Sequence, residues 1–163
     1  MSASPPRIAV LTISDAGSRG ERVDTSGDAI RDWVIAKNYL LTGRDIVPDE
    51  TSSIVSQLIA WADTDQADVV LTTGGTGPTP RDITPEATSI IIERPMPGIA
   101  EALRMSAFPK VPRAILSRGV AGIRGRTLII NLPGSTGGVK DGLQVLEMII
   151  EHAVELLRGK TEH

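Results

Sequence analysis

The sequence has no cysteine, and this absence excludes several kinds of chemistry. Without thiols, the chain forms no disulfide, no thiolate metal site and no cysteine nucleophile. Histidine is almost as scarce, because only His152 and His163 occur, both near the end of the sequence. Transition-metal chemistry carried by the protein's own side chains is therefore not expected.

Aromatic residues and long apolar runs are also scarce. Two Trp, one Tyr and one Phe offer no platform on which nucleic-acid bases could stack, so the core must be built from Ile, Leu, Val and Ala. No apolar stretch approaches the ~20 residues that cross a membrane, and residues 1–6 lack the charged-then-apolar pattern of a secretory signal. We expect a cytoplasmic protein with no membrane and no nucleic-acid partner.

Charge is nearly balanced overall but unevenly spread along the chain. Seventeen basic and 20 acidic side chains give a net charge of −3, which indicates neither a general nucleic-acid binder nor a polyacidic tail. Residues 101–140 contain seven Lys or Arg and a single acid, Glu101, for a local net charge of +6. Two interpretations are open: an anion docks on this stretch, or acids elsewhere in the fold offset a solvated positive face.

Apolar periodicity predicts alternating strands and helices in the first half of the chain. Residues 7–13 form a short apolar and β-branched run, typical of a strand buried on both faces of a parallel sheet. Further strands are predicted at residues 40–47 and 68–71. Helices should begin at Ser26 and at residues 51–52, where hydroxyl side chains precede apolar residues at the 3.6-residue period.

The second half continues the alternation and completes one domain. Thr84, Pro85 and Glu86 match a helix cap, a proline at the first helical position and an acid in the first turn. The remaining predicted elements are a helix at residues 97–105, strands at 114–120 and 127–131, and a last helix at 138–157. We predict a single α/β domain over residues 1–163, with three layers and a mostly parallel sheet flanked by helices. Its ordered core should run from about residue 7 to 158, with frayed ends at 2–6 and 159–163.

Polar residues follow the predicted strands, and they are the candidates for function because ligands of open α/β sheets lie beyond the carboxyl ends of the strands. Ser14 and Asp15 follow the first strand and Asp49 follows the second. The later strands lead to Ser117 and Arg118, and to Asn131 with Pro133, Gly134 and Ser135.

A glycine-rich loop follows the third strand, with the sequence TTGGTGPTPRD over residues 72–82. Gly74, Gly75 and Gly77, around Thr76, would let successive amides point into one concavity that suits phosphate oxygens. The loop matches neither a Walker A motif nor a dinucleotide fingerprint, and a plain tight strand-to-helix connection remains the alternative. Arg81 and Asp82, just before a helix N-terminus, favour the anion site, as a phosphate clamp and a Mg²⁺ ligand.

Asp49 and Asp82 each follow a predicted strand and could converge at the edge of the sheet. Mg²⁺ commonly takes only one or two protein carboxylates and fills its other positions with water and substrate phosphate. The pair therefore suits phosphoryl or nucleotidyl transfer. The alternatives are that Asp49 only favours a helix N-terminus and that Asp15 is an ordinary turn residue.

Ser117, Arg118 and Asn131 supply a hydroxyl, a guanidinium and a carboxamide that could hold a polar heterocycle or a phosphate. No histidine stands near Ser117 in the sequence to activate it, so we interpret these residues as binding groups rather than as an acyl-transfer site. The loop of Pro133, Gly134 and Ser135 precedes a helix, and its amides either face the same cleft or form a plain connection.

These motifs resemble the MogA/MoaB-type molybdopterin-binding family. The resemblance is carried by the glycine loop with its Arg-Asp-x-Thr-Pro-Glu continuation, by Met96-Pro97-Gly98, by Leu116-Ser117-Arg118 and by Asn131-Leu132-Pro133-Gly134-Ser135, and it extends over nearly the whole chain. It implies that ATP and molybdopterin bind side by side and that AMP is transferred to the terminal phosphate of molybdopterin, with release of pyrophosphate.

The resemblance also implies roles for individual residues. Asp49 and Asp82 fall where family members have acids important for catalysis and magnesium. The loop from Gly74 to Gly77 lies in the substrate cleft, and Ser117 and Asn131 fall at positions linked to molybdopterin and nucleotide handling. A homotrimer or homohexamer and a downstream molybdenum-insertion enzyme are the implied partners.

One departure leaves a second function open. Some longer members carry an insertion after the Pro-Gly loop, whereas here Lys140 and Asp141 enter the last helix almost at once, as in compact members labelled MoaB. That group includes members whose adenylylating activity is doubtful. A non-catalytic molybdopterin-binding or carrier protein is therefore the alternative to an adenylyltransferase.

Overall fold

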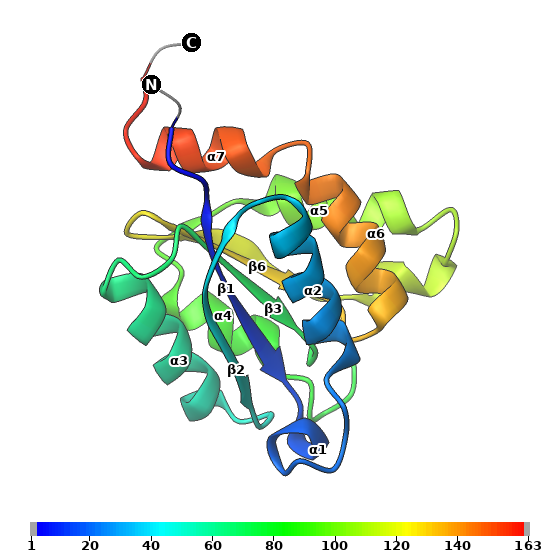
Figure 1. Ribbon diagram of the computed structural model, residues 1–163. Coiled ribbons are helices and arrows are strands. Elements are labelled where there is room, and N and C mark those ends of the chain that lie inside the picture. The colour runs from blue at the N-terminus through cyan, green and yellow to red at the C-terminus, as the bar shows by residue number, and fades with distance from the viewer. Residues whose placement is uncertain (1–2, 162–163) are drawn as a thin grey trace.

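Within residues 3–161, which the computed structural model describes, six strands form one sheet in the order β2-β1-β3-β6-β5-β4 (Figure 1). The strands are β1 (Arg7–Ile13), β2 (Leu40–Val47), β3 (Val69–Thr73), β4 (Arg94–Pro95), β5 (Ala121–Arg124) and β6 (Thr127–Leu132). The first three and β6 run parallel, whereas β5 is antiparallel to β6 and β4 is antiparallel to β5. The predicted three-layer, mostly parallel α/β fold is confirmed.

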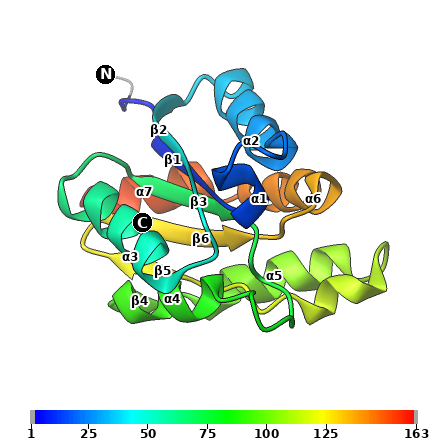
Figure 2. The same cartoon turned by 90° about the horizontal axis from the view of Figure 1, so that it is seen from below.

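Helices cover both faces of this sheet (Figures 1 and 2). They are α1 (Asp15–Ser18), α2 (Thr25–Ala36), α3 (Thr51–Asp63), α4 (Thr84–Ile91), α5 (Pro97–Ala107), α6 (Thr136–Leu146) and α7 (Ile150–Leu157), with a 3₁₀ helix, η1, at Pro112–Leu116. Two separate apolar clusters follow from the alternation of side chains along the strands. In β1, Ile8 and Val10 enter one cluster, and Ala9, Leu11 and Ile13 enter the other.

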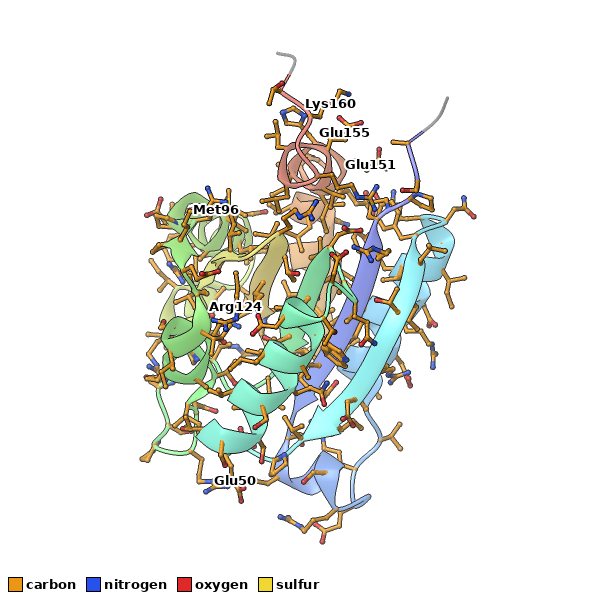
Figure 3. The ribbon with its side chains drawn as sticks, turned by 90° about the vertical axis from the view of Figure 1, so that its left-hand side faces the viewer. Glu50, Met96, Arg124, Glu151, Glu155 and Lys160 are labelled. Carbon is orange, nitrogen blue, oxygen red and sulfur yellow. The ribbon has the colours of Figure 1, made fainter. Side chains whose placement is uncertain are left out.

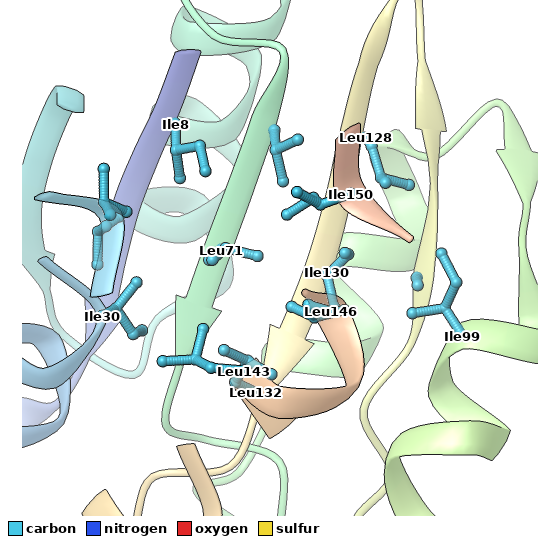
Figure 4. Close-up of a cluster of buried hydrophobic side chains, with 14 of the residues drawn as sticks. Ile8, Ile30, Leu71, Ile99, Leu128, Ile130, Leu132, Leu143, Leu146 and Ile150 are labelled. Carbon is cyan, nitrogen blue, oxygen red and sulfur yellow. The ribbon is translucent and has the colours of Figure 1, made fainter. Parts of the chain in front are cut away.

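The larger cluster joins the sheet to α2, α5, α6 and α7 (Figure 4). Its labelled members are Ile8, Ile30, Leu71, Ile99, Leu128, Ile130, Leu132, Leu143, Leu146 and Ile150. The smaller cluster lies on the other face, where Ile54 and Leu58 of α3 and Ile91 of α4 pack on the strands. Aliphatic side chains dominate both clusters, as the scarcity of aromatic residues predicts. Among the described residues, no helix is long and apolar enough to cross a membrane.

The strand predicted at residues 114–120 is wrong. Residues 112–116 form η1, and the strand begins only at Ala121. Pro112 stands in the first turn of η1, where its fixed φ favours helical geometry. The apolar side chains that suggested a strand, Ile115 and Leu116, are exposed rather than buried in the sheet.

The single last helix predicted at residues 138–157 is divided into α6 and α7. Ile149 interrupts it, with φ −127° and ψ −23°. Leu146 and Ile150 flank the interruption, and both are fully buried in the larger cluster. The apolar spacing continues through the break, and with no glycine or proline at residues 147–149 the sequence carries no sign of it.

Three predicted helix starts also need correction. Asp24, rather than Ser26, caps α2, because its carboxylate accepts a hydrogen bond from the Gly27 amide. Glu50 precedes α3 without a side-chain cap, and Thr84 is the first residue of α4 rather than its cap. The Thr84 hydroxyl instead donates to the carbonyl of Gly74.

The two ends of the described chain are held together at the edge of the sheet where β1 and β3 begin. The buried Asp68 carboxylate accepts from the Arg7 amide (2.8 Å), the Arg7 guanidinium (3.0 Å) and the Arg158 guanidinium (2.6 Å). Arg158 also donates to the carbonyls of Ser4 and Pro5. These two residues, expected to fray, are therefore tied to the end of α7, whereas Ser2 and residues 162–163 of the same prediction lie outside the described residues.

Asp68→Asn should destabilise the protein by about 2–3 kcal/mol at pH 7, because it removes charge-assisted hydrogen bonds from a buried cluster. Burial alone would raise the pKa of Asp68, but the hydrogen bonds from Arg7 and Arg158 hold it below its ordinary value. Its contribution is then fully present above the unfolded-state pKa of about 4 and is lost as pH falls through the lower folded-state pKa.

Urea unfolding of wild type and Asp68→Asn at pH 7 and at pH 2.5–3 measures this contribution. The difference in unfolding free energy should shrink at the lower pH. Asp65→Asn is the matched control, since Asp65 belongs to the same ion-pair group but is exposed. An equal difference at both pH values would contradict the assigned role of the Asp68 charge.

Candidate functional site

The candidate residues gather at one edge of the sheet, the edge at which β1, β2, β3 and β6 end (Figure 1). The approach to β5, residues 117–119, joins them for a reason that the sequence did not show. Because β5 is antiparallel to β6, the segment before β5 lies beside the segment after β6. The Arg118 amide donates to the carbonyl of Thr76 at 2.8 Å, which fastens this segment to the glycine loop.

The glycine loop has a backbone that only glycine tolerates at two positions. Gly74 has φ +99° and Gly75 has φ +69°. A Cβ on Gly74 would lie 2.3 Å from the Ile13 carbonyl oxygen, and one on Gly75 would lie 2.3 Å from the Thr84 hydroxyl. The Thr84 hydroxyl bonds the Gly74 carbonyl (2.9 Å) and its amide bonds the Gly75 carbonyl (3.1 Å). Contacts with the end of β1 and the start of α4 therefore fix the conformation of the loop.

The loop after β6 packs against the glycine loop. The Thr73 hydroxyl donates to the Pro133 carbonyl at 2.7 Å. A Cβ on Gly134 would lie 3.3 Å from the Gly74 Cα, so the two loops touch through backbone. Ser135 caps α6 by accepting from the Gly138 amide, and Ser14 caps α1 in the same way through the Gly17 amide. The hydroxyls of both serines thus hold the starts of helices at the site edge.

Asp15 and Asp49 bind each other's backbone. The Asp49 carboxylate accepts from the Asp15 amide at 2.9 Å, and the Asp15 carboxylate accepts from the Asp49 amide at 3.0 Å. Arg81 donates to both Asp15 carboxylate oxygens at 2.7–3.1 Å, which lowers the pKa of Asp15, as does the Asp49 amide. The guanidinium predicted to clamp phosphate therefore closes an ion pair across the site.

Asp49 and Asp82 both lie beside the glycine loop. A Cβ on Gly75 would be 3.2 Å from Asp49 Oδ1, and a Cβ on Gly77 would be 2.8 Å from Asp82 Oδ2. These glycines are two residues apart, so their Cα atoms are separated by at most ~7 Å. Among residues 3–161, Oδ1 of Asp49 and Oδ1 of Asp82 accept no hydrogen bond.

The electrostatic setting of Asp49 suits a cation. Burial raises the pKa of Asp49, and the negative charges of Asp15 and Asp82 raise it further. The hydrogen bond from the Asp15 amide and the positive charge of Arg81 lower it, but the net shift is upward. A divalent cation would offset this repulsion. In the described part of the chain, no group of three or more His, Cys, Asp or Glu is arranged to hold a metal. The two carboxylates Asp49 and Asp82 fit an ion that takes two carboxylates and completes its shell with water and phosphate, as Mg²⁺ does.

A cavity of about 650 Å³ opens on the other side of the glycine loop, between it, α5, η1 and the start of α6. Seven predicted site residues line it: Thr76, Gly77, Ser117, Asn131, Pro133, Gly134 and Ser135. Its remaining wall is largely apolar and includes Ala100, Leu103, Ala107, Val111 and Leu116. The predicted residues Ser14, Asp15, Asp49, Gly74, Gly75, Arg81, Asp82 and Arg118 are outside this lining, so the site has two parts.

Asn131 serves the structure as well as the cavity. Its side-chain amide donates to the hydroxyls of Thr72 (3.0 Å) and Thr88 (3.1 Å), and its side-chain carbonyl accepts from the Val120 amide (3.1 Å). The side chain is buried, and these bonds join β3, α4 and the approach to β5. Asn131 therefore sets the floor of the cavity.

The positive stretch at residues 101–140 reaches the cavity only in part. Arg104 and Arg113 line it, and Lys110 pairs with Asp141 of the lining at 3.5 Å. Arg124 instead pairs with Asp63 at 2.8 Å. Figure 3 shows Arg124 well above Glu50, which stands next to Asp49 at the site edge. Arg124 and Lys110 thus fit the second interpretation, in which acids elsewhere in the fold offset the positive charge, whereas an anion docking at Arg104 and Arg113 stays a prediction.

The sequence did not predict that α5 forms one wall of the cavity. Arg104 and Leu103 stand in the middle of an amphipathic helix, and their local pattern does not separate a cavity wall from an ordinary helix surface. Arg113 lies just before the segment assigned to a strand. The positive charge of residues 101–140 was the one available sign of this wall.

These features are typical of α/β proteins that bind a phosphorylated ligand at the carboxyl edge of a parallel sheet. The chain belongs to the molybdopterin-binding domain family, since the family model described as “Probable molybdopterin binding domain” matches residues 9–152. The family resemblance found in the motifs is thereby confirmed.

Three similar proteins are matched over most of their own length. The molybdopterin adenylyltransferase of Helicobacter pylori strain J99 is 44% identical over 156 residues, covering 93% of this chain and 88% of that protein. The molybdopterin adenylyltransferase of Escherichia coli K12 is 40% identical over 141 residues, covering 85% and 72%. Among solved structures, the molybdopterin biosynthesis enzyme MoaB of Thermus thermophilus is 47% identical, with a TM-score of 0.89 and coverage of 95% and 98%.

Gly74→Ala should cost at least about 3 kcal/mol of unfolding free energy, because left-handed backbone strain is joined by overlap with a main-chain carbonyl. Gly20→Ala is the matched control. Gly20 has a similar positive φ of +72°, but its added Cβ meets nothing within 4 Å, so only about 1–2 kcal/mol is expected. Urea unfolding of both variants checks the difference, and equal costs would show that Gly74 does not contact β1 as described.

Proposed function

We propose that this protein adenylylates molybdopterin with Mg-ATP, giving adenylyl-molybdopterin and pyrophosphate. The single observation that carries the proposal is the placement of the glycine loop, which lines a largely apolar cavity and also lies beside a pair of carboxylates. A heterocycle and a charged phosphate chain need these different surroundings. The names of the two adenylyltransferase relatives support the same reaction.

The cavity suits a heterocycle that carries a phosphate. Its volume of about 650 Å³ lies within the ~300–1,000 Å³ range of small-molecule sites. Apolar side chains of α5 and η1 would cover the ring faces, and Arg104 and Arg113 would face its polar substituents. The amides that follow Pro133 lie at the N-terminus of α6, where negative charge is favoured.

The acid pair fits a magnesium ion bound with ATP. Asp49 and Asp82 would hold it through their free Oδ1 atoms, and the ion would supply charge neutralisation for the phosphates. The amides of the glycine loop would direct the phosphoryl oxygens toward the same point. Asp15 and Arg81 would fix the position of Asp49 through the reciprocal backbone hydrogen bonds.

The proposed reaction is an in-line substitution at the α-phosphorus of ATP. An oxygen of the molybdopterin phosphate forms a bond to this phosphorus while the bond to the β-phosphate oxygen breaks, and pyrophosphate leaves. No general base is needed, because a phosphate monoester with a second pKa of ~6 is already an anion at pH 7. The scarcity of histidine is thus no obstacle to the reaction.

The separation of the cavity from the acid pair decides which residues are proposed for each role. Asp49 and Asp82 are proposed as catalytic and metal-binding residues. The proposed substrate and nucleotide residues are Ser14, Asp15, Gly74, Gly75, Thr76, Gly77, Arg81, Ser117, Asn131, Pro133, Gly134 and Ser135. Arg118, which the sequence also suggested as a binding group, is not proposed among them because its guanidinium bonds to the protein itself.

The surroundings of the reaction are proposed from the same resemblance. We propose a cytoplasmic homotrimer or homohexamer that delivers its product to a molybdenum-insertion enzyme. Exposed apolar side chains on several elements, including Ile35, Ile90 and Met148, support an assembly of copies. Size-exclusion chromatography with light scattering distinguishes the trimer from the hexamer.

Asp49→Asn and Asp82→Asn should each lower turnover by at least about a hundredfold, because a preorganised charge next to the transferred phosphate is lost. The assay follows adenylyl-molybdopterin in purified protein supplied with Mg-ATP and molybdopterin. Both variants should still fold and bind molybdopterin, which circular dichroism and a binding titration check. Asp65→Asn, an exposed acid at the opposite edge of the sheet, is the control with unchanged turnover.

Two outcomes would change the proposal. Full turnover in both variants would reject the acid pair as the metal site. Molybdopterin binding without any adenylylation by the wild-type protein would favour the carrier function instead.

A further inference from the structure

The Arg118 side chain is occupied by the protein itself. Its Nε donates to the Gly77 carbonyl at 2.9 Å, and its Nη2 donates to the Asp82 carbonyl at 2.6 Å. Its Nη1 bonds the Glu86 carboxylate. All three guanidinium nitrogens therefore have a partner, so a phosphate could recruit this group only by displacing bonds already made.

The part of the glycine loop that Arg118 contacts has few other ties. Between residues 76 and 82, the backbone makes one turn within itself, from the Asp82 amide to the Thr79 carbonyl at 3.0 Å. Thr79 bonds the Asp82 carboxylate, and Arg81 reaches Asp15. Arg118 supplies the contacts that cross from another segment to carbonyls at both ends of this stretch.

Arg118 is itself held from α5. Arg104 donates to the carbonyls of Ser117 (3.3 Å) and Gly119 (2.9 Å), the residues on either side of Arg118. Two arginines therefore connect α5 to residues 117–119, and these residues to the glycine loop. Arg104, Ser117 and Gly119 line the cavity, whereas Asp82 lies at the acid pair.

We propose that Arg118 is a positioning residue, which holds the backbone of Gly77 and Asp82 so that the Asp82 carboxylate stays near Asp49 beside the glycine loop. It does not touch substrate. The expected loss of kcat in Arg118 variants rests on the proposed function, whereas the expected loosening of the glycine loop does not. It also explains why an arginine stands here, because only a planar fork reaches two carbonyls and a carboxylate together.

The geometry separates a positioning role from direct phosphate binding through one substitution. Arg118→Lys keeps the positive charge but cannot bond both carbonyls. A positioning role predicts that Arg118→Lys is as impaired as Arg118→Gln. A phosphate contact predicts that Arg118→Lys keeps most of the affinity for Mg-ATP.

The first measurement is amide hydrogen exchange over residues 76–82 in the full-length protein. Exchange should rise at least about tenfold in both Arg118 variants while β1 and β6 stay protected. Arg126→Lys is the matched control, because Arg126 precedes β6 at the opposite edge of the sheet, and it should leave the loop unchanged. Arg104→Gln removes the hydrogen bonds that hold residues 117–119 and should also raise amide exchange in the loop. It tests the same proposal if an Arg118 variant does not fold.

The second measurement is the division of the effect between kcat and KM. Both Arg118 variants should lose about a hundredfold in kcat, with the KM for molybdopterin nearly unchanged, because a small displacement of the metal ligand affects the reacting geometry. Glu86→Gln removes only the exposed ion pair and should keep turnover within about fivefold of wild type.

The outcomes keep the two proposals apart. Unchanged loop exchange in the Arg118 variants, or an Arg118→Lys variant with wild-type kcat, would overturn the positioning role. Faster loop exchange in a protein whose wild type does not adenylylate molybdopterin would support the role of Arg118 while rejecting the proposed function.

Discussion

The contact between Gly74 and the carbonyl of Ile13 is the constraint on which the site depends. At the end of β3 the chain must turn with positive φ directly over the last residue of β1, where a side chain has no room. This close approach brings the glycine loop down between the segments that follow β1, β2 and β6. Asp15, Asp49 and the Pro133 loop then reach its sides without long connections, so the arrangement needs no flexible lid to bring these groups together.

The division into an apolar cavity and a charged rim has an electrostatic consequence. Carboxylates packed into the cavity would lose hydration, and apolar walls around the acid pair would raise the cost of charging both acids. Asp49 and Asp82 instead lie outside the cavity lining and are partly exposed to solvent. In the proposed function, main-chain dipoles, which cannot be protonated, would lie at the point where two anions meet.

Much of the fold could be predicted from the sequence, most accurately where an apolar segment is buried in the sheet. The strands β1 and β2 match their predicted bounds, and β6 extends its own by one residue. The convergence of Asp15, Asp49 and the glycine loop follows from parallel topology alone. The strand predicted at residues 114–120 was wrong because Ile115 and Leu116 are apolar but exposed. The Arg104 contacts and the Arg81–Asp15 pair depend on segments far apart in sequence, and local patterns do not report such pairings.

The ion-pair group around Asp68 places both ends of the described chain on the side of the sheet away from the glycine loop. Ser4 and Arg158 touch there, whereas the residues proposed to meet substrate lie at the opposite edge of the sheet. A polypeptide appended at either end would emerge at a distance from the cleft. Evolution can therefore splice this domain into a larger chain, or reorder its termini, without rebuilding the surface that receives its ligands.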